Sequence, residues 1–290
     1  MIYVCADDYG LFDKANDRII QCAENGVLNK ISVLMNFENS LESVFERNDI
    51  NLSLHLNLVE GKMISDKSEV KLITDENGFF KYSFIGLMIL SFTKPKEFKQ
   101  AVYEEIKAQV KLYKKLFKKN EDILIDSHQH THMIPGVFKM LLKVISEENI
   151  KVKYLRIPAE PILPYLSEPS LYFTYSPVNI IKQWLLKAFW TLNKKEFKKL
   201  KIPTAYFLGI LFSGKMDEKR VVKILPHYIK KAKKNGEDIE ILFHPGYIKK
   251  EESELFKCNE SFKKFYYSNE RQVEFNTLMS EEIKKILKEV

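Results

Sequence analysis

The chain has 290 residues, of which 45% are hydrophobic and 12% aromatic. These values exclude a disordered chain and a mini-protein, and the length fits one large domain or two small ones. The sequence shows no internal repeat or inter-domain linker, so we expect a single domain over residues 1–290. The formal net charge is +7, but the lysines are scattered in pairs along predicted amphipathic helices. A nucleic-acid binder would gather such charge on one face, so the sequence argues against a nucleic-acid partner.

The cysteines and the N-terminal segment bear on the cellular compartment. Cys5, Cys22 and Cys258 are widely spaced and form no CxxC pair, which argues against a disulfide framework and a thiolate zinc cluster. The first residues carry no basic stretch and turn acidic at Asp7, unlike a signal peptide. The longest uncharged apolar run, residues 84–92, is too short to cross a bilayer. We therefore expect a cytoplasmic protein without a membrane partner.

Short apolar segments alternate with longer helical patterns along the chain. Strands are predicted at residues 2–6, 31–35, 52–56, 123–125, 152–155, 205–208 and 239–243. Helices are predicted at residues 13–25, 41–47, 96–118, 137–148, 180–200 and 217–235, and the tail is also predicted to be helical. Continuous apolar strands separated by helices indicate a parallel sheet that is covered on both faces, and therefore an α/β fold.

Two segments interrupt this alternation. Residues 59–95 contain a turn signal at 75–78 and predict a hairpin-like insertion. Residues 157–178 are rich in proline and aromatic residues and predict a long ordered loop, a candidate lid or substrate wall. The aromatic residues of the tail are compatible with either a core or an interface; they are Phe262, Phe265, Tyr266 and Tyr267.

Five of the six histidines fall at the predicted carboxyl ends of strands. Reactive groups of parallel α/β folds stand in the loops that follow those ends, so the histidines as a group indicate an active site. The remaining histidine, His227, lies inside a predicted helix and is interpreted as structural. The candidate residues are Asp7 and Asp8 after the first strand, His55 in the third, Asp126 to His132 after the fourth, Arg156 after the fifth, and His244 after the last.

Asp7 and Asp8 directly follow an apolar strand. Adjacent side chains point to different sides of a strand, so one carboxylate can bind a metal while the other acts as a general base. The alternative is a turn or cap before the helix at Asp13, which is the commoner role of such residues. His55, alone, would more often be a hydrogen-bonded core histidine than a metal ligand.

The segment from Asp126 to His132 holds three histidines within five residues, which is costly to bury without metal binding or acid–base chemistry. We expect His128 to bind the metal, and His130 and His132 to support the ligands or face the substrate. Asp126 is expected to orient an imidazole through its free N–H. The alternative is a histidine tract on the surface.

Three further residues complete the predicted site. His244 precedes Pro245 and Gly246, a tight turn that suits a general acid. Arg156 is expected to pair with Asp7 and keep it ionised, or to form an ordinary surface ion pair. Tyr247 is expected to line the cleft or to pack in the core. One carboxylate and two histidines with open positions indicate a catalytic metal, with amide, ester and phosphoester hydrolysis all open.

At these residues the chain resembles the YdjC-like carbohydrate deacetylases, which include chitooligosaccharide deacetylase and are related to the polysaccharide deacetylases. The similar segments occur in family order: Ala6 to Gly10, Leu54 to Leu58, Asp126 to His132, and Phe243 to Tyr247. Arg156 to Pro158 resembles an R-x-P element of the wider superfamily. Tyr9 stands where the family usually has Phe.

The resemblance implies a distorted (β/α) barrel, a seven-stranded parallel barrel with an insertion around residues 59–95. It implies one divalent metal ion held by Asp8, His55 and His128. It gives Asp7 the role of base toward the attacking water and His244 that of acid toward the leaving amine. It also implies Mg²⁺, whereas two imidazoles suit Zn²⁺, Co²⁺ or Mn²⁺ better. A homodimer is a further expectation from the resemblance.

The leading hypothesis is a metal-dependent N-deacetylase that releases acetate from a small N-acetylated carbohydrate such as a chito-oligosaccharide. Two alternatives stay open, a metal-dependent phosphoesterase and a catalytically silent carbohydrate-binding module. Aromatic residues that could stack on sugar faces, or simply pack in the core, are Tyr9, Tyr165, Tyr172 and Phe173.

Overall fold

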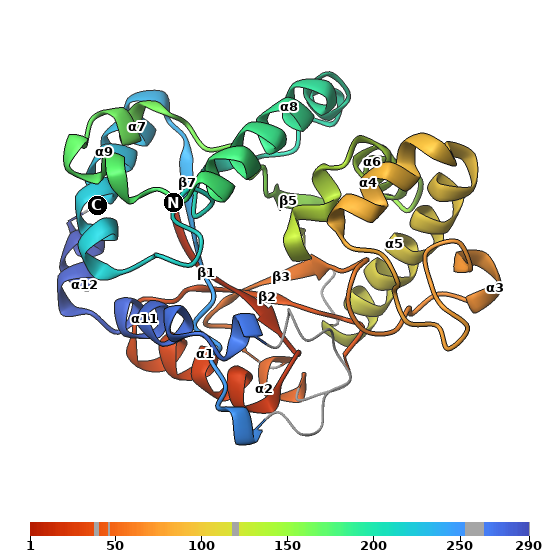
Figure 1. Ribbon diagram of the computed structural model, residues 1–290, viewed down its shortest axis with the longest axis horizontal. Helices are drawn as coiled ribbons and strands as arrows, with labels where there is room; N and C mark the ends of the chain where they lie inside the picture. The colour runs from red at the N-terminus through yellow and green to blue at the C-terminus, as the bar shows by residue number, and fades with distance from the viewer. Residues whose placement is uncertain (38–40, 46, 118–121, 253–263, 290) are drawn as a thin grey trace.

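The computed structural model describes residues 1–37, 41–45, 47–117, 122–252 and 264–289. Over these residues the chain forms a sheet of seven strands, all parallel to their neighbours (Figure 1). The strands are β1 (Ile2–Tyr9), β2 (Lys30–Val33), β3 (Asn51–Leu56), β4 (Ile123–Ser127), β5 (Val152–Leu155), β6 (Ala205–Leu208) and β7 (Asp238–Phe243). Their order is β5-β4-β3-β2-β1-β7-β6, which confirms the predicted α/β fold with seven parallel strands.

The sheet curls so that its two edge strands approach each other. The amide of Leu155, at the end of β5, donates to the carbonyl of Pro203, just before β6, at 3.1 Å. Among the described residues, β5 and β6 form no ladder beyond such contacts. The architecture is that of a distorted, incompletely closed (β/α) barrel, in agreement with the expected class.

Helices of the described residues cover the outer side of this sheet (Figure 1). The α-helices are α1 (Asp13–Asn25), α2 (Glu42–Phe45), α3 (Lys67–Val70), α4 (Phe84–Thr93), α5 (Pro95–Phe117), α6 (Pro135–Glu147), α7 (Leu163–Leu166), α8 (Pro177–Leu200), α9 (Glu218–Asn235), α11 (Asn269–Leu278) and α12 (Glu281–Lys288). The 3₁₀ helices are η1 (His128–Met133), η2 (Pro169–Thr174) and η3 (Lys250–Glu252). Within the described part of the chain, no helix is both long and apolar enough to span a bilayer.

The insertion at residues 59–95 is only in part the hairpin that the sequence predicts. The turn at residues 75–78 does form, with the Gly78 amide bonded to the Asp75 carbonyl, but the flanking segments make just two isolated antiparallel bridges. Much of the remainder is helix α4, which begins at the cap residue Ser83. Its sequence is apolar nearly all round, so its periodicity does not distinguish a helix from a buried strand.

The segment predicted as a loop at residues 157–178 is also more ordered than expected. It contains α7 and η2, and α8 begins at Pro177 because proline is well suited to the first turn of a helix. Tyr165 of α7 packs in a cluster with Tyr175, Phe212 and Tyr228. The ring of this tyrosine is therefore part of the core.

The inner face of the curled sheet is polar. Lys30 of β2 and Glu240 of β7 are completely buried, although the sequence predicts apolar strands at 31–35 and 239–243 and no buried charge in them. Register brings such residues side by side: Ser32 lies opposite Ser53, and His55 lies opposite Asp126. Because buried charges must be paired, this face has to be organised as a network of ion pairs and hydrogen bonds.

Candidate metal centre and active site

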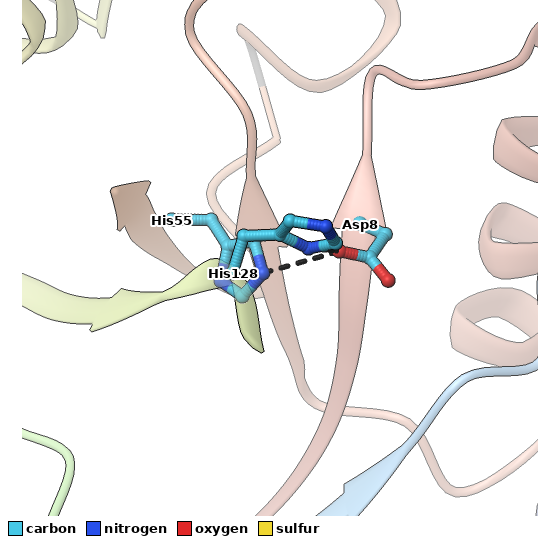
Figure 2. A group of neighbouring side chains, drawn as sticks. All are labelled: Asp8, His55 and His128. Carbon is cyan, nitrogen blue, oxygen red and sulfur yellow. Dashed lines mark hydrogen bonds and ion pairs between the residues drawn. The ribbon is translucent and has the colours of Figure 1, made fainter. Parts of the chain in front are cut away.

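Asp8, His55 and His128 come together at the carboxyl end of the sheet (Figure 2). The three side chains are buried, and one donor atom from each lies within 4.8 Å of the other two. Oδ1 of Asp8 is 2.6 Å from Nδ1 of His128 and 3.2 Å from Nε2 of His55. One carboxylate and two imidazoles in this arrangement form a donor set that could hold a divalent ion.

A β-bulge turns Asp7 and Asp8 toward the same site. In a regular strand the two side chains would lie on opposite faces. The register between β1 and β2 shifts between Ala6 and Tyr9, and Asp8 has a φ of 70°. A bulge of this kind redirects a side chain, and both carboxylates consequently line one cavity.

Asp126 fixes the orientation of His55. Its Oδ1 atom accepts a hydrogen bond from Nδ1 of His55 at 2.6 Å, which leaves Nε2 directed at Asp8. Burial lowers the pKa of His55, but Asp7, Asp126 and Asp8 oppose it and raise this pKa to about 10. The carboxylates thus favour positive charge at the position of Nε2, whether a proton or a metal ion supplies it.

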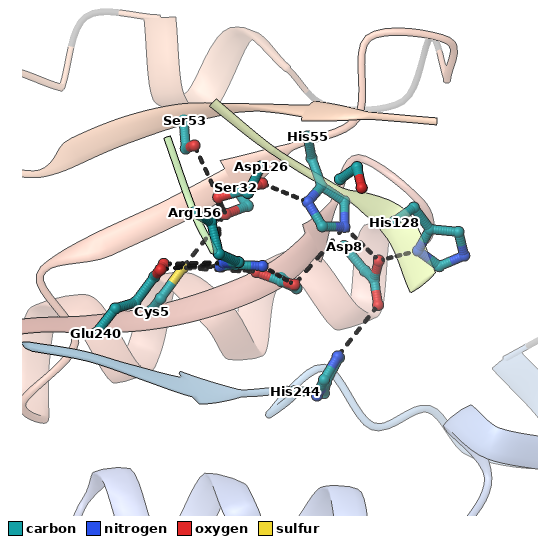
Figure 3. A network of polar contacts seen from close by, with 12 residues as sticks. Cys5, Asp8, Ser32, Ser53, His55, Asp126, His128, Arg156, Glu240 and His244 are labelled. Carbon is teal, nitrogen blue, oxygen red and sulfur yellow. Dashed lines mark hydrogen bonds and ion pairs between the residues drawn. The ribbon is translucent and has the colours of Figure 1, made fainter. Parts of the chain in front are cut away.

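Behind the candidate ligands lies a buried ion network (Figure 3). Arg156 makes a bidentate pair with Asp7, at 2.7 and 2.9 Å, and also contacts Glu240 at 2.8 Å. Lys30 joins Asp126 and Glu240, at 2.8 and 2.6 Å. Burial raises the pKa of Glu240, but Arg156 and Lys30 together lower it to about 2. The network therefore holds Asp7 and Asp126 in fixed orientations.

The charge of this network fits a divalent cation. Four buried carboxylates, those of Asp7, Asp8, Asp126 and Glu240, face two buried cations, Lys30 and Arg156. With neutral histidines the cluster carries a net charge of −2, which is unfavourable in a buried site unless positive charge is added. A cation bound by Asp8, His55 and His128 would supply this positive charge.

A second group of potential ligands, Cys5, Asp7 and Asp126, is already filled by an arginine. Nη2 of Arg156 lies 3.2 Å from Sγ of Cys5, 2.9 Å from Oδ1 of Asp7 and 3.3 Å from Oδ2 of Asp126. A fixed positive charge at the centre of the three atoms excludes a metal ion from that position. Asp7 is thereby left outside the ligand group around Asp8.

His244 follows β7, which lies on the other side of β1 from the strands that position His55 and His128. Its Nε2 atom lies 4.0 Å from Oδ2 of Asp8, and its Nδ1 atom lies 3.8 Å from Glu274 of α11. The backbone amide of His244 donates to the same carboxylate of Glu274 at 2.5 Å. Burial raises the pKa of Glu274, whereas Arg271 and His244 bring it below its usual value. The imidazole is thus held between two carboxylates.

The C-terminal part of the chain supplies site residues that the sequence does not predict there, two of them, Phe265 and Tyr266, expected only in a core or an interface. Tyr266 donates a hydrogen bond to Oδ2 of Asp8, and the ring of Phe265 meets that of His244 edge-on at 5.4 Å. Glu274 is the third such residue. The sequence offers a weak signal for Glu274, because Arg271 stands one helical turn before it, but none for Tyr266. Phe262 lies outside the described residues.

The histidines of η1 separate into different environments. Gln129 and His130 have positive φ values, 51° and 58°, so the segment is kinked and does not align His128 with His132 on one helical turn. His132 accepts from the hydroxyl of Ser127 and donates to the carbonyl of Arg156 at 2.8 Å. His130 lines the cavity, and its buried Nδ1 atom has no hydrogen-bond partner among the described residues.

The candidate centre lies in the wall of a cavity of about 1020 Å³. Aromatic residues of the insertion face it, namely Phe79, Phe80, Tyr82 and Phe84, as does Phe265. Tyr9 and Tyr247 are not among the lining residues: Tyr9 is buried against Ser43, and Tyr247 packs under Arg18. Of the segment 157–178, which the sequence predicts as a substrate wall, Val178 lines the cavity from the first turn of α8, and residues 157–177 do not. The wall therefore comes mainly from the insertion and α8.

Comparison with known proteins agrees with this arrangement. A family model described as YdjC-like protein matches residues 1–289. The chain belongs to the YdjC-like family. A carbohydrate deacetylase of Clostridium beijerinckii is 20% identical over 292 residues, which covers 98% of this chain and 93% of that protein.

Other YdjC-like relatives match over a shorter stretch. A carbohydrate deacetylase of Danio rerio is 29% identical over 168 residues, 57% of this chain, and the match spans about half of the relative, 51%. The fold also resembles that of a crystal structure described as a putative cellobiose-phosphate cleavage protein from Enterococcus faecalis. The TM-score is 0.69 with 20% identity, covering 99% of this chain and 94% of the other.

Proposed function

We propose that this chain is a metal-dependent carbohydrate N-deacetylase that removes the acetyl group from a small N-acetylated sugar, such as a chito-oligosaccharide. One observation carries the proposal. Asp7 lies 3.8 Å from Nε2 of His55, His244 lies 4.0 Å from Oδ2 of Asp8, and both line one cavity together with Asp8, His55 and His128. An amide hydrolase needs a base for water and an acid for the amine around one electrophilic centre. The names of the curated relatives support the same reaction.

The proposed ligands of the metal are Asp8, His55 and His128. When bound, a divalent ion would supply Lewis acidity toward the amide carbonyl and the attacking water. Two nitrogen donors and one oxygen donor favour Zn²⁺, Co²⁺ or Mn²⁺ over Mg²⁺, which prefers oxygen ligands. The net charge of −2 that the cluster carries with neutral histidines, Asp8 included, supports a divalent rather than a monovalent ion.

Asp7 is the proposed base, and Arg156 positions it. The two hydrogen bonds from Arg156 fix the orientation of the Asp7 carboxylate, and Asp7 still lines the cavity. Asp7 takes a proton from water as the water oxygen bonds to the acetyl carbon. His244 then gives a proton to the nitrogen as the C–N bond breaks, and the products are acetate and an amine. Glu274 holds the imidazole during this transfer.

The cavity wall is suited to a sugar ring. Phe79, Tyr82 and Phe265 offer apolar faces near the centre, and such faces commonly pack against the C–H groups of sugars. His130 presents a buried nitrogen that a substrate hydroxyl or amide could satisfy, since buried polar atoms are rarely left unpaired. These residues are the proposed sugar contacts.

The test is acetate release from a panel of N-acetylated mono- and oligosaccharides. Metal-stripped protein is compared with protein reloaded with Mg²⁺, Zn²⁺, Co²⁺ or Mn²⁺. We expect acetate only with metal, and a loss of at least about a hundredfold in kcat for Asp7→Asn and for His244→Asn. Both variants should still bind metal when measured by calorimetry, because neither residue is a proposed ligand.

Two results would contradict this assignment. Wild-type turnover in Asp7→Asn would remove Asp7 from the reaction. Phosphate release from sugar phosphates, with no acetate from any sugar, would instead support metal-dependent phosphoester hydrolysis.

A further inference from the structure

Helices α4 and α8 carry exposed apolar side chains that no described residue covers. On α4 these are Ile85, Ile89 and Phe92, which lie on one helical face at spacings of four and three. On α8 they are Val178, Ile181 and Trp184. All six side chains are between 54% and 70% exposed. We call this set of six residues the α4–α8 rim. Single exposed apolar residues are common on protein surfaces, but a group of six on two helices is characteristic of a binding surface.

The rim is continuous with the cavity. Ile85, Val178 and Ile181 are more than half exposed, and all three also line the cavity that contains Asp7 and His244. Phe84 of α4 and Phe189 of α8 approach each other between the two helices, with ring centroids 6.4 Å apart. An apolar path therefore runs from the candidate centre to the outer surface, where α8 stands out from the body (Figure 1).

We infer that the substrate is an N-acetylated sugar linked to an apolar chain, and that this chain lies along the α4–α8 rim while the sugar occupies the cavity. The inference rests on the proposed function and narrows its substrate class. A free oligosaccharide presents hydroxyl groups along its whole length and gains little from an apolar exit. An alkyl or polyprenyl chain gains free energy with each methylene group that leaves water.

A second copy of this chain is the main competing occupant. Three rim residues form part of the cavity wall, so a subunit seated on them would obstruct the opening through which a substrate enters. An apolar chain attached to the substrate covers the same surface without that conflict. The charge of α8 also favours the substrate chain, because this helix carries six lysines and one glutamate. Such a basic helix would attract the anionic linkage of many lipid-borne sugars and repel the same helix of a second copy.

The first experiment compares the methyl and octyl β-glycosides of N-acetylglucosamine, with the octyl compound kept below its critical micelle concentration. Each fully buried methylene group is worth about a fourfold gain, so partial burial of the chain predicts a kcat/KM at least about tenfold higher for the octyl glycoside. In Ile85→Asn/Ile181→Asn this ratio should fall toward one. Val273→Asn, an exposed apolar position on α11 outside the cavity, is the matched control and should keep the wild-type ratio.

The second experiment reports binding without turnover. The chain contains two tryptophans, both on α8, so Trp190→Phe leaves Trp184 as a single fluorescent reporter on the rim. In Asp7→Asn/Trp190→Phe, the octyl glycoside should shift the Trp184 emission to shorter wavelength, and the methyl glycoside should not. Thermal unfolding of every variant verifies that the fold is retained.

The outcomes separate this inference from the proposed function. Acetate released equally well from both glycosides, with no shift of Trp184, overturns the apolar-chain site and leaves deacetylation standing. A shift with the octyl glycoside but no acetate from either compound supports the site and rejects the reaction. A stable dimer that Ile85→Asn/Ile181→Asn dissociates would assign the rim to a second copy and overturn the inference.

Discussion

Oδ1 of Asp126 and Nδ1 of His55 lie 2.6 Å apart on neighbouring parallel strands, in direct register. The other oxygen of Asp126 is bonded to Lys30, Ser32 and Ser53. The carboxylate is therefore fixed by three donors before it meets the imidazole. A rigid partner of this kind selects the histidine tautomer whose free nitrogen faces the candidate metal position.

Replacing Asp126 with Asn should weaken metal binding by about 10- to 100-fold. The amide can donate to Nδ1 of His55 and so stabilise the tautomer whose proton is on Nε2. Calorimetric titration of metal-free protein with Zn²⁺ measures the effect. Ser53→Ala, which removes one of the three donors to Asp126, is the matched control and should cost much less. An unchanged affinity in a folded Asp126→Asn protein would show that His55 is not a ligand.

Tyr266→Phe tests the contribution of the C-terminal segment. The variant removes a donor from Oδ2 of Asp8 and should lower metal affinity about tenfold, because partners of a ligand tune its affinity. Tyr103→Phe is the control, since its hydroxyl also donates to a carboxylate, Glu147, but on the outer helices. Equal affinities for the two variants would place Tyr266 outside the centre.

Lys30→Met should destabilise the fold by about 3 to 5 kcal/mol. Burial lowers the pKa of Lys30, but Asp126 and Glu240 hold it above its usual value. In the variant both carboxylates lose this ammonium partner and keep only their other contacts. Urea unfolding measures the loss. At the exposed position 14, Lys14→Met should stay within about 0.5 kcal/mol of wild type. A Lys30→Met protein as stable as wild type would mean that the network reorganises without it.

The buried His132 should make the protein less stable in mild acid. Burial is the main cause that lowers its pKa from 6.5 to about 4. A depressed pKa in the folded state stabilises the fold above pH 6.5, and this stability is lost as the pH falls toward 4. Between pH 7 and pH 5 the loss is roughly 2 kcal/mol.

Urea unfolding at the two pH values tests this expectation. His132→Gln removes the titrating group and can retain one acceptor for Ser127 and one donor for Arg156, so its stability should depend less on pH. His227→Gln, at a partly exposed position, should keep the wild-type slope. Identical slopes for the two variants would contradict the assignment to His132.

The sheet could be predicted because its signal is local. Each strand is a short run of mainly apolar residues, and the segments between strands show a clear helical period. The sequence predicts a hairpin-like insertion where helix α4 lies, because a uniformly apolar segment shows no helical period. Lys30 and Glu240 were missed for a different reason: burial of a charge depends on partners that lie far away in the sequence.

The candidate site was predictable at strand ends and not elsewhere. The positions of Asp7, Asp8, His55, His128 and His244 follow from strand polarity alone. Tyr266 and Glu274 come from the helical C-terminal part of the chain and contact Asp8 and His244. Their local sequence does not predict these long-range contacts. The simultaneous exposure of Asp7 and Asp8 to the cavity also depends on a bulge, which residue types do not encode clearly.

The hydrogen bond between Tyr266 and Asp8 joins residues 258 positions apart. During synthesis, Asp8 of β1 leaves the ribosome well before Tyr266, which completes its surroundings. The carboxylates of β1 are therefore made before Arg156, His244 and Tyr266, and they lack these partners until the later segments have emerged. A metal ion that bound the proposed centre in that interval would meet an incomplete set of neighbours, so we expect the chain to fold before the proposed metal binds.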